Sequence, residues 1–312
     1  MTLPPRPRLR GVLALACTAA LLTGTGCAPA AEAPQDPGSA EEPSSSDATS
    51  ASASAAASAS PLPPSEGVLR IGVPAERPGL SEREGDADPT GVDVETARTV
   101  AEYLGFEDDQ ISWRTVPADD LAAALAAGRV DVAIGGLAVA DGDGTSVDVA
   151  GPSLALRHDL LVGAAAGVAG PADLAGKTVC AVEGSAAMAA ITPLLPADAE
   201  MLTQQSTGEC LTALLSGRVA AVAGDEPELA ALARSEEAGD AVGLIGAPYG
   251  TTAYGVGLPE GSTLCSAVTA ALETRFRDGA WQESAADLAD ATGIGLDTEL
   301  EAASRPDAAR CG

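Results

Sequence analysis

The charged residue with the most informative position closes one of two similar phrases. Asp225 ends ALLSGRVAAVAGD (213–225), and ALAAGRVDVAIGG (124–136) has Gly, Arg and Val at the same places and ends at Gly136. Each phrase is typical of a helix end, a Gly-Arg turn and a short apolar strand that finishes at a glycine. In an open α/β sheet the ligand lies beyond the carboxyl ends of the strands. We therefore expect a ligand site where the two phrases end.

No residue pattern in the chain indicates catalysis. The one histidine, His158, stands beside Arg157 without a motif around it, so we expect it to have a structural or exposed role. The cysteines do not have the spacing of metal ligands, and none is left as a nucleophile if they form disulfides. We therefore predict that the protein is not an enzyme and has no cofactor and no metal.

The N-terminus has the pattern of a bacterial lipoprotein signal. Arginines within residues 6–10 precede the apolar run 11–22, which is too short to span a membrane as a mature helix. The following GTGC resembles a lipobox, although Gly24 stands where leucine is usual. We predict that Cys27 is lipidated and anchors the protein at the extracellular face of the cell membrane. Ordinary cleavage near residues 28–30 is the alternative.

The segment after Cys27 and the overall charge limit the partners. Residues 28–64 are mostly Ala, Ser, Pro and acids, and they cannot bury enough apolar surface to fold, so we expect a disordered tether. The formal net charge of −28 excludes nucleic acid and anionic lipid surfaces as partners. We expect a monomer that meets the membrane only through its lipid.

The cysteines favour disulfides. Two of the six lie in the signal segment and at the lipid site, which leaves an even number in the exported domain. Four cysteines allow three pairings. We predict Cys180–Cys210 and Cys265–Cys311, because each pair falls within one of the two lobes proposed next.

Strand and helix patterns alternate from Val68 onward, which predicts parallel sheets covered by helices. The pattern restarts near Thr178, and the extended segments Leu154–Val162 and Thr252–Leu258 connect the two series. Two crossing segments between two lobes would form a hinge beside a cleft. The predicted organisation is a signal peptide (1–26), a tether (27–65), a first lobe (66–155 and 254–312) and a second lobe (156–253).

Five segments in this order resemble the extracellular solute-binding proteins of polar amino-acid ABC transporters, and most closely the glutamate/glutamine-binding lipoproteins of actinobacteria. They are GVDVETARTVAEYLG (91–105), GRVDVAIGGLAV (128–139), SVDVAGPSLALRHDLLVG (146–163), ADLAGKTVCAVEGSAA (172–187) and YGVGLPEGS (254–262). Cysteines corresponding to Cys180 and Cys210 also occur in those lipoproteins. The resemblance implies a type II periplasmic-binding-protein-like α/β fold, with two lobes of mostly parallel sheet flanked by helices and joined by two hinge strands. It also implies delivery of a small polar solute, an amino acid or a derivative, to a membrane permease.

The resemblance also implies roles for particular residues. Asp225 would accept the ammonium group of an amino acid, and the amides of Gly184, Ser185 and Ala186 would meet its carboxylate. A helix N-terminus offers unpaired N–H donors and the positive end of a dipole, which suits that role. Asp225 and Ser185 could instead be helix N-caps, since Pro227 follows Asp225 in what would be the first turn.

The chain departs from the family pattern after Gly136. Where the family has a threonine and then an arginine that grips the ligand's carboxylate, this chain has Ala138 and Asp143. Arg77 or Arg157 could replace that cation. Asp143 could also be solvated and without a role.

The same departure allows two different interpretations. The ligand could be cationic or lack the carboxylate, in which case Asp143, Asp225, Glu76 and Glu183 would form an acidic pocket. Binding could instead be weak or lost, and the lipoprotein would then act as a sensor through a membrane signalling partner. A few dehydratases share the implied fold, which leaves an enzyme as a minor alternative. The residues predicted to bind the ligand are Glu76, Arg77, Gly136, Ala138, Arg157, Glu183, Gly184, Ser185, Ala186 and Asp225.

Overall fold

The computed structural model describes residues 67–139 and 147–307, all of which belong to one compact unit, Ala56–Gly312. Among them, no helix combines the length and the apolar character that a membrane span requires. The predicted signal peptide, tether and lipid site at Cys27 lie outside the described residues, as do Asp143 and Cys311. The predicted Cys265–Cys311 bridge and the lobe boundaries stay predictions.

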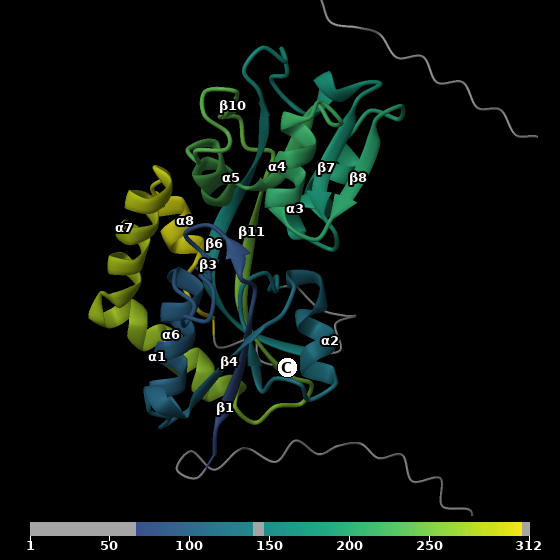
Figure 1. The fold of residues 1–312 in the computed structure, drawn as a ribbon. Helices are drawn as coiled ribbons and strands as arrows, with labels where there is room; N and C mark the ends of the chain where they lie inside the picture. The colour runs from purple at the N-terminus through teal and green to yellow at the C-terminus, as the bar shows by residue number, and fades with distance from the viewer. Residues whose placement is uncertain (1–66, 140–146, 308–312) are drawn as a thin grey trace, which may run out of the picture. The chain divides into compact units, whose positions relative to one another are not determined.

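Strands and helices alternate between residues 178 and 244, as the sequence indicates, and the described chain ends in consecutive helices (Figure 1). The strands are β1 (Leu69–Val73), β2 (Glu76–Arg77), β3 (Ser81–Glu82), β4 (Ile111–Thr115), β5 (Val132–Ala133), β6 (Val147–Gly163), β7 (Thr178–Val182), β8 (Glu200–Gln204), β9 (Ala221–Asp225), β10 (Val242–Leu244) and β11 (Gly250–Pro259). The α-helices are α1 (Val92–Tyr103), α2 (Leu121–Ala126), α3 (Ala186–Ile191), α4 (Thr207–Leu215), α5 (Glu226–Ala233), α6 (Cys265–Asp278), α7 (Ala280–Thr292) and α8 (Thr298–Ala303).

Most strands join one sheet in the order β4-β1-β5-β11-β6-β9-β7-β8, with β10 also paired to β6. β1 is parallel to β4 and β5, and we call these three the first strand group. β7 is parallel to β8 and β9, which form the second strand group. The antiparallel strands β6 and β11 stand between the two groups. The prediction of an α/β fold with parallel strands is confirmed.

β6 and β11 are the two predicted crossing segments, and they lie side by side along the length of β11 (Figure 1). Their register runs from Gly250 opposite His158 to Pro259 opposite Val147, and it shifts between Tyr254 and Val256. Gly255 lies at that shift, where a Cβ atom would collide with the backbone oxygen of Ala150 in β6. Only a glycine allows the two backbones to approach so closely there.

Each strand group has its own apolar core. One cluster joins Leu69 and Ile71 of β1 to Val256 of β11 and to the inner face of α6. α1 contributes Val94, Ala97 and Ala101 to it, as their helical spacing predicts. Two further clusters enclose the second strand group and contain only residues between positions 160 and 249. The two cores therefore lie on different stretches of the chain.

Some elements differ from the sequence prediction. The apolar strand expected at the end of the phrase 124–136 is reduced to β5, because Gly135 and Gly136 adopt positive φ and end the ladder. α8 was not predicted, although Asp297 caps it by accepting hydrogen bonds from the amides of Glu299 and Leu300. The short helix escapes hydrophobic-period analysis, because only Leu300 of its residues is buried.

The predicted Cys180–Cys210 disulfide is confirmed. Cys180 lies in β7 and Cys210 in α4, with their Cα atoms 5.5 Å apart and a sequence separation of 30 residues. The bond ties the helix that covers the second strand group to the strand beneath it.

The Cys180→Ala/Cys210→Ala double variant should unfold at lower urea concentration. Releasing a loop of this length is expected to lower the free energy of unfolding by about 3–4 kcal/mol on the loop-entropy model. Equilibrium urea unfolding without reductant, followed by circular dichroism, measures the difference. An unchanged midpoint and slope would show that the bond does not stabilise the fold.

Candidate functional site

A cavity of about 270 Å³ lies beyond the carboxyl ends of strands from both groups. This is the edge of the sheet at which ligands of open α/β proteins bind. The loops after β1, β4, β5, β7 and β8 and the end of β9 contribute Pro74–Arg77, Val116–Asp119, Gly136, Gly184–Ala187, Gln205–Thr207 and Ala223–Asp225 to its lining.

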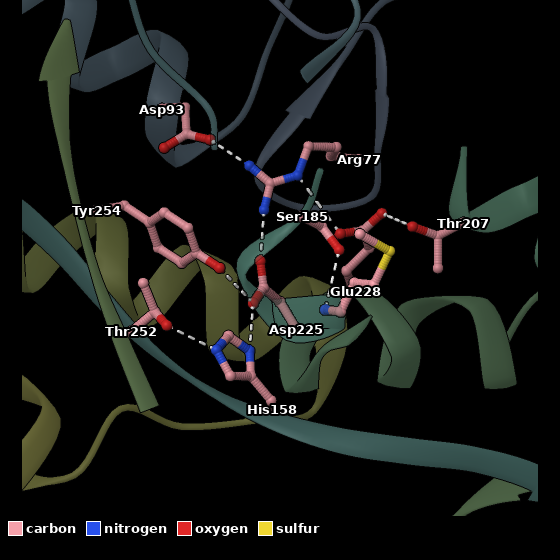
Figure 2. Close-up of polar contacts among 10 residues, drawn as sticks. Arg77, Asp93, His158, Ser185, Thr207, Asp225, Glu228, Thr252 and Tyr254 are labelled. Atoms are coloured by element: carbon pink, nitrogen blue, oxygen red, sulfur yellow. Dashed lines mark hydrogen bonds and ion pairs between the residues drawn. The ribbon is translucent and has the colours of Figure 1, made fainter. Parts of the chain in front are cut away.

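Arg77 is the centre of a buried group of charges beside this cavity (Figure 2). Its Nη2 atom lies 2.7 Å from Asp225 Oδ2, its Nη1 atom 3.3 Å from Asp93 Oδ2 and its Nε atom 3.4 Å from Glu228 Oε2. The Arg77 side chain is only 11% exposed. The guanidinium is therefore bound by carboxylates on three of its sides, and its carbon also lies 6.0 Å from the ring centre of Tyr254.

Asp225 occupies the N-cap position of α5, but its carboxylate does not cap the helix. One oxygen binds Arg77, and the other accepts a hydrogen bond of 2.8 Å from the Tyr254 hydroxyl. The same oxygen lies 2.9 Å from Nδ1 of His158. Asp225 therefore stands at the start of the helix, but its side chain binds the charged group and not the helix N-terminus.

His158 is fully buried and reaches the group from β6. Its Nε2 atom lies 2.8 Å from the Thr252 hydroxyl on β11, and the ring is thereby fixed between the two long strands. A structural or an exposed role was expected for His158; its burial contradicts the exposed role, and neither expectation indicated its contact with Asp225. The signal was present only in the fold, because His158 and Asp225 face each other in the β6–β9 ladder.

Glu228 and Asp93 complete the group, and neither was predicted. Glu228 lies three residues after Asp225, a spacing that puts both on one face of the first turn of α5. That spacing could have identified it. Asp93 stands in the first turn of α1, and both acids are 4% exposed. The Thr207 hydroxyl donates a hydrogen bond to Glu228.

Burial and charge act against each other in this group. Burial lowers the pKa of Arg77, but the charges of Glu228, Asp225 and Asp93 outweigh burial and hold that pKa above its ordinary value. Burial raises the pKa of Asp225, yet the contact with His158 and the charge of Arg77 leave it below its ordinary value. The guanidinium and the Asp225 carboxylate are thus held in their charged forms.

The two other acids respond in the opposite direction. Burial raises the pKa of Asp93 to about 6 against the attraction of Arg77, and it also raises the pKa of Glu228. The single positive charge of the Arg77 guanidinium does not balance the charges of three buried carboxylates. The last proton of the three carboxyl groups is therefore lost only at higher pH.

The other predicted site residues divide into two sets. Glu76, Gly136, Gly184, Ser185 and Ala186 line the cavity. Ser185 is also the N-cap of α3, since its hydroxyl oxygen accepts a hydrogen bond from the amide of Met188. Ala138, Arg157 and Glu183 are not in the lining.

Arg157 has partners elsewhere. Its Nη2 atom lies 2.5 Å from Asp297 and 3.7 Å from Glu299, both at the N-terminus of α8. Ala138 forms a β-bridge with Tyr254, and Glu183 is exposed, with its amide bound to Gln204. Of the two candidate substitute cations, the fold therefore brings Arg77 and not Arg157 to the cavity. Within the described ranges no group of three or more His, Cys, Asp or Glu side chains could hold a metal ion.

Comparison with protein families matches residues 69–287 to the bacterial extracellular solute-binding proteins, family 3. The chain belongs to this family. The resemblance seen in the sequence is thereby confirmed, and so is the type II binding-protein fold, which solved structures of amino-acid-binding proteins share.

Relatives of this family 3 protein include the glutamate-binding protein GluB of Corynebacterium efficiens, which is 28% identical over 69% of this chain and 76% of its own. The L-arginine-binding protein of Pseudomonas aeruginosa is 26% identical over 69% of this chain and 85% of its own. Among solved structures, the amino acid ABC transporter substrate-binding protein AbpA from Streptococcus pneumoniae, bound to L-arginine, matches with a TM-score of 0.65. That match has 22% identity and covers 74% of this chain and 98% of AbpA, which shows a shared fold.

The Asp93→Asn variant should change how stability depends on pH. Folded Asp93 has a pKa of about 6, above the ordinary value of about 4, so its contribution to stability is complete below about pH 4 and is lost as pH rises through 6. Asparagine does not titrate. Relative to wild type, the variant should therefore gain about 3 kcal/mol of stability between pH 4 and pH 7.

Urea unfolding of both proteins across that pH range measures this difference. Glu102→Gln, which removes an exposed carboxylate of the same helix, controls for the loss of one negative charge. Asp93 faces Arg77, Asp225, Glu228 and Arg275, and these groups are the same in both proteins. A difference that stays constant with pH would contradict the role of burial at Asp93.

Proposed function

We propose that this family 3 protein is the lipid-anchored, extracellular substrate-binding protein of an ABC importer. It would bind a small polar solute, an amino acid or a derivative, in the cavity and present it to a membrane permease. The observation that carries the proposal is the cavity itself, which is lined by loops of both strand groups and has Arg77 and Asp225 in its wall. The two named relatives bind glutamate and L-arginine, which supports an amino acid as the class of solute.

Binding would act through the relative position of the two strand groups. A solute that contacts both groups favours the arrangement in which they are close together, whereas a solute that contacts one group shifts nothing. β6 and β11 connect the groups, so small changes of backbone angles in these strands would suffice as a hinge. The permease would then recognise the closed arrangement with solute in the cavity.

The charges of the lining favour a solute with a positive group. Glu76, Asp119 and Glu209 line the cavity together with Asp225 and Glu228, while Arg77 is the one cation among the described lining residues. A cationic amino acid or an amine therefore suits the lining better than a dicarboxylic acid does. The protein would release the solute chemically unchanged.

The alternative is a sensor that acts through a membrane signalling partner. Its specific support is that Arg77 and Asp225 bind each other, which leaves fewer charged groups to hold a cargo. A sensor needs only a ligand that changes its arrangement, and it does not need a permease.

A thermal-shift screen over amino acids, amines and short peptides tests the binding proposal. A ligand that binds only the folded protein should add about 2.7 kcal/mol of stability at a hundredfold excess over its dissociation constant. Mass spectrometry of the recovered ligand should show an unchanged mass. If no member of the screen raises the melting temperature, the importer proposal loses its basis.

The Asp225→Asn variant should lose binding of the solute found in the screen by a factor of ten or more, on the usual scale for a buried charged contact. Calorimetric titration measures the affinity. Asp131→Asn is the matched control, because Asp131 also pairs with an arginine, Arg70, but lies outside the cavity lining. Equal affinity in both variants and the wild type would remove Asp225 from the binding site.

A further inference from the structure

Arg77 forms ion pairs with residues in or beside the two strand groups, which lie on different stretches of the chain. It lies in β2, just after β1 of the first strand group, and Asp93 lies in α1, which packs on that group. Asp225 ends β9 of the second strand group, and Glu228 follows it in α5. The ion pairs of Arg77 with Asp225 and Glu228 therefore join the first strand group to the second (Figure 2).

We propose that Arg77 is a built-in occupant of a cation site, which holds the two strand groups together in the absence of solute and must leave Asp225 and Glu228 before a cationic solute can bind there. Arg77 is thus an internal competitor of the solute. The competition between Arg77 and a solute rests on the proposed function, because that function makes the cavity the solute site. The role of Arg77 in linking the two strand groups does not depend on the proposed function.

The bonding of Arg77 is that of a bound ligand. Its guanidinium uses three nitrogen atoms on three carboxylates, at 2.7, 3.3 and 3.4 Å, and the side chain is 11% exposed. The planar, forked group can do this, and a lysine ammonium cannot reproduce the geometry. Separation of the strand groups would leave Asp225 and Glu228 without this partner, and both are almost completely buried.

The remaining charge of the site favours exchange with an external cation. Asp93, Asp225 and Glu228 carry more negative charge than one guanidinium balances, and Glu76, Asp119 and Glu209 add further carboxylates to the described cavity lining. A cationic solute is attracted into the cavity and meets the same carboxylates that hold Arg77. Solutes that cannot displace the guanidinium gain little there.

The ion pairs of Arg77 determine the populations of the open and closed arrangements before any solute is present. A ligand shifts an equilibrium only by its difference in affinity for the two states, and its apparent affinity falls with the fraction of protein that is competent to bind it. With Arg77 in place, the closed arrangement dominates in the free protein. Removal of Arg77 should open the free protein and strengthen the binding of small guanidinium ions.

Distance measurements between the two edge strands of the sheet test the linking role. Spin labels on genetically encoded keto amino acids at Arg114 in β4 and Thr203 in β8, both exposed, leave the cysteines undisturbed in the full chain. The label distances should be narrowly distributed without solute. In Arg77→Ala they should shift to longer and broader values.

Ethylguanidinium is the probe for the site that Arg77 vacates. Titrated into Arg77→Ala, it should restore the short distances and raise the melting temperature in a saturable way. It should do neither in the wild type, where the site is filled, nor in Arg77→Ala/Asp225→Asn, where the strongest partner is neutral. A residue with a merely local structural role would lower the melting temperature without changing the distances.

Arg129→Ala is the matched control, because Arg129 pairs with Asp120 on the surface at 2.7 Å, and its distances should equal those of the wild type. If Arg77→Ala does not fold, Glu228→Gln keeps the shape and the Thr207 contact and should show the same shift in part. Wild-type distances in a folded Arg77→Ala variant would overturn the proposal. Since no natural solute is used, a negative solute screen would contradict the proposed function without touching this result.

Discussion

A charge that is removed from water must be paired with an opposite charge. In this fold that charge is the guanidinium of Arg77, and several helices and strands supply its partners. Its carboxylate partners come from α1, β9 and α5, and one of them is held in turn by Tyr254 of β11 and approached by His158 of β6. Each of these elements therefore has a fixed position relative to a single side chain. The same contacts place Arg77 in the wall of the cavity.

The sheet makes such convergence possible. Parallel strands end at the same edge, so the loops after β1, β4 and β5 meet one another, as do those after β7 and β8 and the end of β9. β6 and β11 place the two sets of loops opposite each other. Residues that are far apart in the sequence, such as Arg77 and Glu228, become neighbours without any local signal of their contact.

The alternation of strands and helices could be predicted, because it follows from the local spacing of hydrophobic residues and from the Gly-Arg turns. β7 begins at Thr178, where the pattern was predicted to restart, and the crossing segments became β6 and β11. β5 shortened because two consecutive glycines with positive φ follow it closely, a conformational effect that strand propensity does not report.

The site could be predicted only in outline. The end of the second phrase pointed to Asp225, the resemblance to Gly184 and the missing family arginine to Arg77, and these residues line the cavity. The partners Asp93 and His158 could not be predicted, because their contacts depend on the ladder between β6 and β9 and on how α1 packs. Arg157 was an equal candidate in sequence, but it pairs with Asp297, a residue at the end of an unforeseen helix.

The separation of the two cores along the chain has a consequence for how the protein is made. Every member of the second strand group's clusters lies between residues 160 and 249, whereas the first core needs residues 256–272 to be complete. A chain synthesised from its N-terminus thus exposes its earliest strands before their last partners are made. The second strand group can reach its native packing and form the disulfide between residues 180 and 210 at a stage when the first strand group still lacks its C-terminal packing partners.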